Sequence, residues 1–277
     1  MKASNIKFSV LMSVYSKEKA EYLKMAIDSI VNQTLKPNEF IIVEDGNLTE
    51  ELNECLDNYV LKYNYIKLIK LDQNVGLGRA LNEGLKHCKY DYVARMDSDD
   101  ISMLDRFEKQ IKYLEENPLC DVVGGNIIEF DSCNNEDISR RIVPVDDKAI
   151  YNYLKKRNPM NHVTVIFKKS SVLECGSYRD CPYFEDYYLW ARMINNNKKL
   201  HNIAEDLVRV RAGLVMSNRR GNFSYIKHII NFENKLLKLK LINIFGYLYN
   251  IVLRIIISLV PNSIRYNFYQ KRLRNGK

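Results

Sequence analysis

YVARMDSDD, at residues 92–100, is the stretch of sequence that decides the fold. Residues 92–96 are expected to form a short buried strand. Three carboxylates follow that strand within four residues, at Asp97, Asp99 and Asp100. Carboxylates this close repel one another unless a positive charge compensates them, and Mg²⁺ or Mn²⁺ suits such oxygen ligands. The alternative is a surface turn in which the aspartates cap the next helix.

Upstream of this stretch, strand and helix signals alternate. Three short apolar runs are also expected to be buried strands, at residues 8–15, 40–43 and 66–71. Apolar residues at helical spacing occupy the segments between them. This alternation predicts an α/β fold with a mostly parallel, doubly wound sheet flanked by helices. Ligands bind such sheets at the carboxyl ends of the strands, so Tyr15, Asp45 and Asp97 are expected to converge on one cleft.

Charge and cysteine content narrow the class of protein. The chain has 277 residues and a formal net charge of +8, and residues 224–277 hold ten basic side chains against one acidic side chain, Glu233. The basic charge therefore belongs to this tail, which argues against a nucleic-acid partner for the rest of the chain. The six cysteines form no CxxC pair, which favours reduced thiols in a cytosolic protein. No secretory signal is expected at the N-terminus.

The tail also contains a long apolar segment, residues 241–260. Its length approaches that of a membrane-spanning helix, but Arg254 inside it argues against spanning. Four more basic residues follow near the end of the chain, at Lys271, Arg272, Arg274 and Lys277. This pattern is typical of an amphipathic helix that lies on an anionic membrane surface. The alternative is a C-terminal helix that docks on the domain.

Seven stretches, in this order and spacing, resemble the motifs of family 2 glycosyltransferases with the GT-A fold. They are FSVLMSVY at 8–15, SIVNQT at 29–34, VEDG at 43–46, NVGL at 74–77 with Asn82 and Gly84, MDSDD at 96–100, RFEKQ at 106–110 and EDYYLW at 185–190. The resemblance covers residues 8–230, roughly. It implies a Rossmann-like sheet that binds a nucleotide sugar, followed by a C-terminal helical tail.

The resemblance implies a nucleotide pocket at the first two strand ends. Val14 and Tyr15 would line the pocket for the base, and either Glu44 or Asp45 would contact the polar edge of the base. The family often has two aspartates where this chain has Glu44-Asp45, so both carboxylates stay candidates. The alternative for Tyr15 is ordinary packing in the core.

The resemblance also implies contacts to the ribose, the diphosphate and a metal ion. Gly76 would allow the backbone to approach the diphosphate, and Arg79 would stand in for the arginine that the family places directly before its asparagine. Asp97 and Ser98 would contact the nucleotide sugar. Asp99 would bind Mn²⁺ or Mg²⁺, with Asp97 as a second ligand, and the metal would act as a Lewis acid on the leaving diphosphate.

A second acidic pair, Glu185-Asp186, supplies the candidate for acid–base chemistry. By family position Asp186 is the expected catalytic base, and Glu185 is expected to orient the acceptor sugar. His162 and Trp190 are further candidates for contact with the acceptor. The alternatives are a helix start favoured by two acids, a structural histidine and a core tryptophan.

Together these features predict an inverting hexosyltransferase of the kind that builds bacterial O-antigen and capsular polysaccharide. The expected donor is a nucleotide diphosphate sugar, with UDP as the base by resemblance, and the expected acceptor is an oligosaccharide or a saccharide on polyprenyl diphosphate. We expect the enzyme to bind peripherally to the inner, cytoplasmic face of the cell membrane. The predicted domains are residues 1–223, with a donor half at about 6–130 and an acceptor half at about 131–223, and a tail at 224–277.

Two other classes of protein share parts of this pattern. A sugar-phosphate nucleotidyltransferase has a similar sheet, but it would need a glycine-rich loop after the first strand, and residues 16–19 contain no glycine. A non-catalytic, membrane-bound module would keep the nucleotide pocket and would not depend on Glu185-Asp186.

Overall fold

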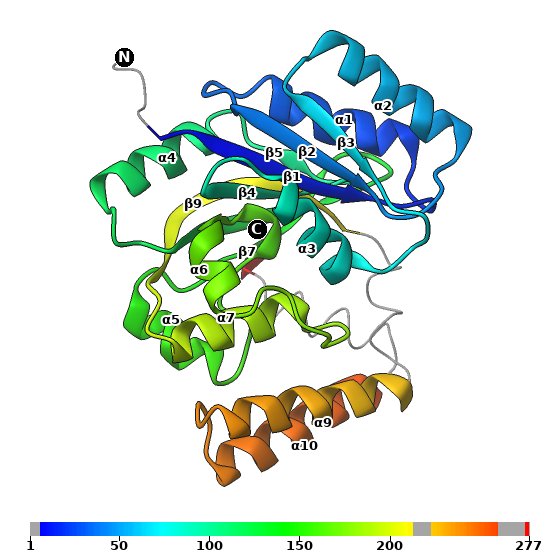
Figure 1. Ribbon diagram of the computed structural model, residues 1–277. Coiled ribbons are helices and arrows are strands. Elements are labelled where there is room, and N and C mark those ends of the chain that lie inside the picture. The colour runs from blue at the N-terminus through cyan, green and yellow to red at the C-terminus, as the bar shows by residue number, and fades with distance from the viewer. Residues whose placement is uncertain (1–5, 213–222, 260–274, 277) are drawn as a thin grey trace.

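The computed structural model describes residues 6–212, 223–259 and 275–276 (Figure 1). Its centre is a ten-stranded mixed sheet with helices on both faces. The α/β class with a largely parallel, helix-flanked sheet, which the alternating sequence signals predict, is therefore confirmed.

The parallel part of the sheet holds the four strands that the sequence predicts. They are β1 (Phe8–Val14), β2 (Glu39–Glu44), β3 (Ile66–Lys70) and β4 (Tyr92–Asp97), and they lie in the order β3-β2-β1-β4. Helices α1 (Ala20–Val31), α2 (Glu50–Lys62) and α3 (Leu77–His87) connect them. Because β1 pairs with both β2 and β4, Val14 lies opposite Glu44, and Ser13 lies opposite Asp97. The predicted convergence of these strand ends is therefore built into the strand order.

The remaining strands pair mainly in antiparallel fashion beyond β4. They are β5 (Ile101–Ser102), β6 (Val122–Asp131), β7 (Asp137–Arg141), β8 (Ile166–Lys168), β9 (Leu200–Ala212) and β10 (Asn275–Gly276). The long strands β6 and β9 run parallel to each other. Gly124 and Gly125 lie inside β6, where a Cβ atom would come within 2.6 Å of Asn202 and 2.5 Å of Leu207. These glycines therefore mark close packing beside β9.

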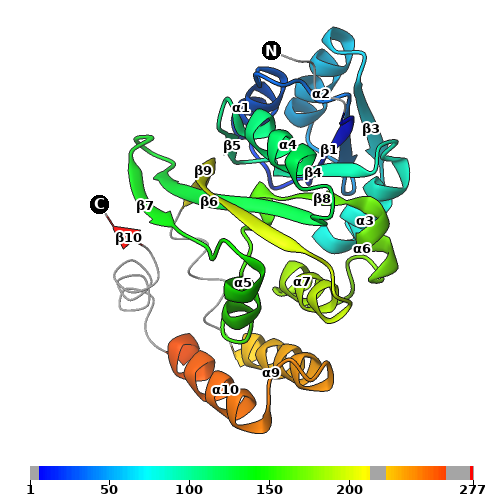
Figure 2. The ribbon, with the colours of Figure 1, turned by 90° about the vertical axis from the view of Figure 1, so that its left-hand side faces the viewer.

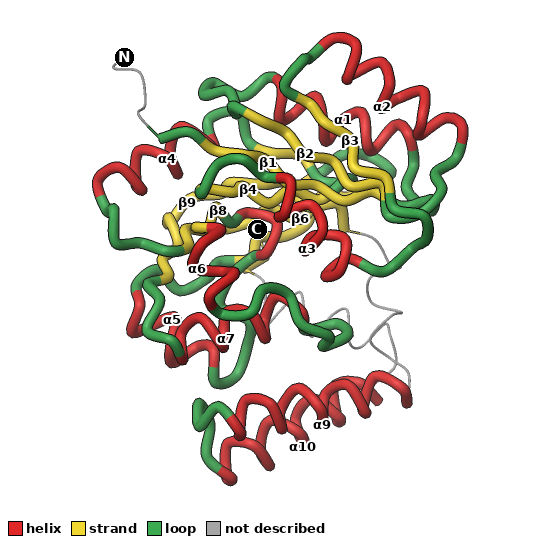
Figure 3. The backbone as a smooth tube through the Cα atoms, in the orientation of Figure 1, coloured by secondary structure: helices red, strands yellow, loops and turns green. Residues whose placement is uncertain are grey.

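Helices cover both faces of the sheet and separate its core into two layers. One face carries α1, α2 and α4 (Arg106–Glu116), and the other carries α3, α6 (Lys169–Glu174) and α7 (Glu185–Asn195), as Figures 2 and 3 show. Strand β1 feeds both layers, because Val10 and Met12 point to the first layer and Leu11 to the second. The short helix α5 (Asp147–Leu154) completes the second layer, whereas Val163 of the short helix η1 (His162–Thr164) packs in the first.

The C-terminal helices form a hairpin below α7. Helix α9 (Phe223–Lys238) is part of the core, since Phe232 stacks on Phe184 at 4.6 Å and lies 4.4 Å from Tyr187 between ring centroids. Helix α10 (Ile244–Leu259) packs beside α9. Within the described residues, no helix combines the length and the apolar character needed to cross a bilayer. The four basic residues near the end of the chain, at 271, 272, 274 and 277, which the sequence pattern assigns to a membrane surface, lie outside the described part of the chain.

An exposed apolar stripe runs along α10. We define it as Ile244, Phe245, Leu248, Tyr249, Val252, Leu253, Ile256 and Leu259, all of which are exposed. The segment to which the two sequence interpretations apply is α10: Asn250 and Arg254 contact the carbonyl oxygens of Lys155 and Lys156 in the domain, while the stripe faces away from these contacts as an exposed apolar surface.

Candidate functional site

The end of β2 is tied to the start of α3 by Asp45. Its two carboxylate oxygens accept the N–H of Val75 at 2.7 Å and the N–H of Gly76 at 3.1 Å. The next residue, Gly46, has a φ of 84°, and a Cβ there would lie 2.6 Å from the backbone nitrogen of Asn74. Asp45 and Gly46 therefore position the loop that opens α3.

Glu44, one residue earlier, is buried but lacks the backbone hydrogen bonds that Asp45 accepts. Its carboxylate is buried and lies 3.5 Å from Lys70 Nζ, and burial raises its pKa. Its Oε1 atom has no hydrogen-bond partner among the described residues. A buried acceptor without a partner is costly, so Glu44 has capacity for a ligand at the strand end where Val14 is buried and Tyr15 is half-buried.

The first turn of α3 faces the second acidic pair. Gly76 has a φ of 86° and precedes the helix, and a Cβ added to Gly78 would lie 3.4 Å from Cγ of Glu185. Arg79 is exposed on this turn, and its guanidinium makes no ion pair with the described residues. Asn82 fixes the arrangement, because its side chain donates to Tyr178 O at 2.7 Å. The predicted donor loop and the predicted acceptor residues thus meet.

A buried arginine holds the acidic cluster at the end of β4. Arg95 is completely buried, and its Nη2 donates to Oδ1 of Asp97. Ser98 Oγ donates to Glu18 Oε2 at 2.8 Å, which brings a further acid to the cluster. At the end of β9, Arg211 donates its N–H to Asp100 at 2.8 Å. Asp100 therefore has a structural partner.

Asp97 and Asp99 are suited to a divalent cation. Burial, followed by the charges of Asp97 and Glu18, raises the pKa of Asp99 to about 7, so a cation beside it would be favourable. In the part of the chain that the structure describes, no cluster of three or more His, Cys, Asp or Glu side chains is arranged to hold a metal. Mg²⁺ is often held by one or two carboxylates together with substrate phosphates, and Asp97 and Asp99 fit that pattern.

Asp186 lies at the start of α7 with one defined partner. Its Oδ2 accepts a hydrogen bond from Asn158 Nδ2 at 2.6 Å. Burial raises the pKa of Asp186, and the bond from Asn158 opposes this by favouring the charged form. The neighbouring Glu185 also has its pKa raised by burial. A carboxylate with a raised pKa can accept a proton more readily near neutral pH.

One cavity of about 390 Å³ brings distant site residues together. Asp97 from β4, His162 from η1 and Asp186 from α7 all line it. The cavity also touches Tyr183 and Tyr225, so aromatic surface lies near the carboxylates. We call it the acceptor cavity. Its lining connects the predicted donor and acceptor halves of the site.

His162 lines this cavity, and Trp190 lies behind it in the core. His162 Nε2 lies 2.8 Å from the Tyr178 hydroxyl, and burial lowers the pKa of His162 well below its usual value, which favours the neutral ring. Trp190 has no exposed surface and belongs to the core, with its ring centroid 6.2 Å from that of His162. In this conformation Trp190 offers no surface on which a sugar could stack.

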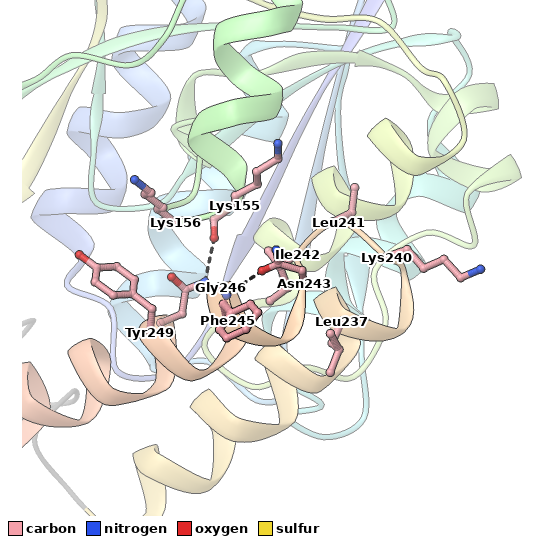
Figure 4. Close-up of a pocket in the computed structure, with 11 residues that line it drawn as sticks. Lys155, Lys156, Leu237, Lys240, Leu241, Ile242, Asn243, Phe245, Gly246 and Tyr249 are labelled. Atoms are coloured by element: carbon pink, nitrogen blue, oxygen red, sulfur yellow. Dashed lines mark hydrogen bonds between the residues drawn. The ribbon is translucent and has the colours of Figure 1, made fainter.

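A second cavity, of about 740 Å³, lies at the corner between α5 and the α9–α10 hairpin (Figure 4). Three lysines line it, Lys155, Lys156 and Lys240, together with the aromatic rings of Phe245 and Tyr249. We call it the hairpin cavity. Among the described residues no carboxylate lines it, in contrast to the acceptor cavity.

Three residues of the site were not among the sequence-based candidates. Asn158 supports Asp186 and Glu18 joins the acidic cluster, and neither has a local sequence signal that distinguishes it from an ordinary loop residue. Arg95 did have a signal, because it is a charged residue within an otherwise apolar strand. Such a residue needs a partner, and the nearest acid on the same side of the strand is Asp97.

The sequence comparisons agree with one another. The model of "Glycosyl transferase family 2" matches residues 9–181. An uncharacterized glycosyltransferase of Haemophilus influenzae is 40% identical, covering 97% of this chain and 100% of its own. The amylovoran biosynthesis glycosyltransferase AmsE of Erwinia amylovora is 38% identical over 95% of this chain and 98% of its own. The UDP-Gal:alpha-D-GlcNAc-diphosphoundecaprenol beta-1,3-galactosyltransferase of Escherichia coli is 35% identical over 97% of each chain.

Solved structures with low sequence identity share the fold. S. aureus TarS 1–349 in complex with UDP-GlcNAc superposes with a TM-score of 0.65 at 18% identity, covering 95% of this chain and 75% of that one. The mannosyltransferase PcManGT of Pyrobaculum calidifontis, in complex with GDP-Man and Mn²⁺, gives a TM-score of 0.62 at 13% identity over 96% and 82% of the two chains. Sequence and fold therefore lead to one conclusion: this chain belongs to glycosyl transferase family 2, with a GT-A-like fold.

Proposed function

We propose that this glycosyltransferase moves a hexose from a nucleotide diphosphate sugar, with UDP as the base, to a lipid-linked saccharide during bacterial cell-surface polysaccharide synthesis. The observation that carries the proposal is the acceptor cavity, which joins Asp97 at the end of β4 to Asp186 on α7. Two relatives support the proposal by their names: that of Erwinia acts in amylovoran biosynthesis, and that of E. coli acts on a saccharide carried by a lipid diphosphate.

In the proposed reaction Asp186 is the base. It takes the proton of an acceptor hydroxyl while the oxygen of that hydroxyl forms a bond to the anomeric carbon of the donor sugar. The bond between that carbon and the diphosphate oxygen breaks, and the nucleoside diphosphate leaves with the electron pair. Attack from the face opposite the leaving group inverts the anomeric centre. Asn158 orients Asp186, and Glu185, beside the first turn of α3, would contact the acceptor sugar.

The donor is assigned to the ends of β1, β2 and β4 and the start of α3. Val14 and Tyr15 would line the base pocket, and the buried Oε1 of Glu44, which has no partner among the described residues, makes Glu44 the better placed carboxylate for the base. Both oxygens of Asp45 are occupied by backbone N–H groups. Gly76 and the exposed Arg79 would approach the diphosphate.

Asp97 and Asp99 are the residues that would hold Mn²⁺ or Mg²⁺, with Ser98 between them near the donor. When bound, the cation would stabilise negative charge on the leaving diphosphate. The raised pKa of Asp99 supports this assignment. The P. calidifontis structure, which shares the fold, contains Mn²⁺ with its nucleotide sugar.

We also propose a peripheral position on the inner face of the membrane, with the boundary between catalytic domain and tail near residue 223. The apolar stripe of α10 supports the proposal, because eight exposed apolar side chains on one helix favour a non-aqueous partner. The basic residues of the tail, such as Lys235 and Lys240, would add attraction to anionic lipid.

The test is a panel of UDP-, GDP- and dTDP-sugars, each incubated with and without Mn²⁺ and with a saccharide on lipid diphosphate. Metal-dependent release of nucleotide together with a glycosylated lipid is the expected result. Release of pyrophosphate from a sugar phosphate and a nucleoside triphosphate would instead identify a nucleotidyltransferase. Binding of nucleotide with no turnover for any donor would support the non-catalytic alternative.

A further inference from the structure

Four cationic side chains line the acceptor cavity on the side of the tail. They are Arg141 at the end of β7, Lys156 and Arg157 in the turn after α5, and Arg254 on α10, and we call them the basic rim. None of them belongs to the strand ends or the helix start assigned to the donor. The proposed base chemistry of Asp186 does not require four cations at this place.

The basic rim is preorganised, because two of its side chains hydrogen-bond to the backbone of the turn that contains the other two. Arg141 donates through Nη2 to the carbonyl oxygen of Asn158 at 2.7 Å. Arg254 donates through Nη2 to the carbonyl oxygen of Lys156 at 3.0 Å, and its Nε lies 2.9 Å from the fully buried carboxylate of Glu233. These contacts fix the backbone on either side of Arg157, so the cations are held at the cavity in advance of any ligand.

The acids that line the acceptor cavity have contacts of their own, and Asp186 also lies within reach of the charge of Arg141, which favours its ionised form. Asp97 is paired with Arg95, and Asp100 accepts the N–H of Arg211. Asp186 is bonded to Asn158, and Glu233 pairs with Arg254 of the rim. The rim therefore places cationic side chains in the same cavity as the proposed catalytic carboxylate.

Apolar side chains of α10 lie next to the basic rim. Leu253 and Ile257 of α10 line the acceptor cavity together with the rim, and Leu253 is 40% exposed as part of the apolar stripe. Lys156 lines the hairpin cavity as well, where Phe245 and Tyr249 of the same stripe form the wall (Figure 4). A ligand at the rim would thus have the carboxylates on one side and exposed apolar surface on the other.

We propose that the basic rim binds the diphosphate of the lipid-linked acceptor, with its sugar directed toward Asp186 and its lipid along the stripe of α10. The inference rests on the proposed function and adds the residues that recognise the acceptor. Guanidinium and ammonium groups pair with phosphate oxygens through charge-assisted hydrogen bonds. A neutral saccharide would leave the charge of these cations uncompensated, whereas a lipid diphosphate matches both the cations and the apolar surface.

A binding experiment tests the rim without knowledge of either sugar. Farnesyl diphosphate is titrated into the full-length protein in saturating UDP and Mn²⁺, with farnesol as the uncharged comparison. The variant Lys156→Gln/Arg157→Gln should bind farnesyl diphosphate roughly tenfold or more weakly than the wild type, because it loses charge-assisted hydrogen bonds. UDP affinity should be unchanged. Lys112→Gln/Lys148→Gln is the matched control, since both lysines are exposed and line neither cavity.

Equal affinity of wild type and rim variant for farnesyl diphosphate would overturn the proposal, and so would an equal loss in the matched control. If the double variant does not fold, Lys156→Gln alone is used, because this side chain is exposed. Its expected loss of affinity is smaller but in the same direction.

A transfer experiment separates this proposal from the proposed function. Each protein is assayed with two acceptors that carry the same sugar, one on lipid diphosphate and one as an uncharged octyl glycoside. The rim variant should raise KM for the diphosphate acceptor and leave both kcat and the octyl glycoside reaction unchanged. An equal loss with both acceptors would mean that the rim only maintains structure. Absence of transfer by the wild type with every donor would count against the proposed function, while the farnesyl diphosphate result would still decide the rim.

Discussion

At the scale of single residues, the site depends on how each carboxylate is partnered. Asp45 is occupied by backbone N–H groups, Asp97 by Arg95 and Asp100 by Arg211. Asp186 has a single side-chain partner, Asn158, and faces a cavity. Asp45 and Asp100 therefore hold backbone segments of the fold, whereas Asp186 lines the cavity and is placed to accept a proton from a ligand there.

Asp186→Asn tests the assignment of the base. We expect kcat to fall by roughly 10²–10⁴-fold, because a positioned general base contributes about that factor. The affinity for UDP, measured by titration calorimetry, should stay the same, since Asp186 is assigned to the acceptor side. Asp57→Asn, an exposed aspartate on α2, is the matched control. Turnover by Asp186→Asn close to that of the wild type would remove Asp186 from the mechanism.

Asn158→Ala should move the pH profile. A base must be ionised to act, so kcat falls as the pH falls through the pKa of Asp186. The bond from Asn158 favours the ionised form and lowers that pKa. Its loss should therefore raise the pKa and shift the acid limb of kcat to higher pH, with little change at the alkaline plateau. The exposed Asn58 provides the comparison variant, Asn58→Ala. An acid limb that does not move would show that the bond has no effect on the base.

At the scale of elements, the four parallel strands could be predicted from local pattern, whereas the long strand β9 could not. Strands β1 to β4 are short apolar runs bounded by helices, so local pattern is enough to find them. Strand β9 carries charged residues, and its pairing with β6 and β5 depends on partners far away in the sequence. Local periodicity contains no information about such partners, so it does not predict β9 or its place in the sheet.

The same limit applies to the site. The acidic cluster at residues 97–100 and the pair Glu185-Asp186 can be recognised as motifs, because their members lie close together in the sequence. Asp97 and Asp186 meet in one cavity because the end of β4 and the start of α7 lie close together, and the sequence offers no direct sign of this. The contact of Trp190 with the core was equally hidden, since a single tryptophan suits a sugar platform or a core and only burial distinguishes them.

The close packing of α3 against the sheet can be tested by a substitution at Gly84. A Cβ on Gly84 would contact Leu11 Cδ1 and lie 2.7 Å from Val43 Cγ2, so the helix would have to move away from β1 and β2. Gly84→Ala should lower the free energy of unfolding by about 1–3 kcal/mol, the usual cost of overpacking, as measured by urea denaturation. Gly246→Ala on α10, where the nearest atom lies at 3.3 Å, should not be destabilised comparably. Equal stability of Gly84→Ala and wild type would contradict the packing described here.

At the scale of the whole molecule, the tail is joined to the catalytic domain through its first helix. Phe232 of α9 is buried against Phe184 and Tyr187, next to the start of α7 that carries Asp186. Removal of the tail would therefore disturb the core as well as any surface contact. Substitutions on the outer face of α10 are a cleaner probe of membrane attachment than deletion.

Val252→Glu/Ile256→Glu places two charges in the apolar stripe. We expect this variant to lose co-sedimentation with vesicles that contain phosphatidylglycerol, because burying charged side chains among lipid is unfavourable. The control, Leu61→Glu/Leu119→Glu, changes two leucines that are more than 80% exposed elsewhere on the molecule. Loss of sedimentation in both variants, or in neither, would show that the stripe is not the attachment surface.

Helix α10 contributes Leu253, Arg254 and Ile257 to the acceptor cavity and shows its remaining apolar residues to the outside. Under the two proposals made for this helix, α10 would serve both recognition of the acceptor and attachment to the membrane. A chimera that exchanges this tail for that of a relative would change the choice of acceptor along with the choice of surface, and an engineer could not transplant one trait without the other.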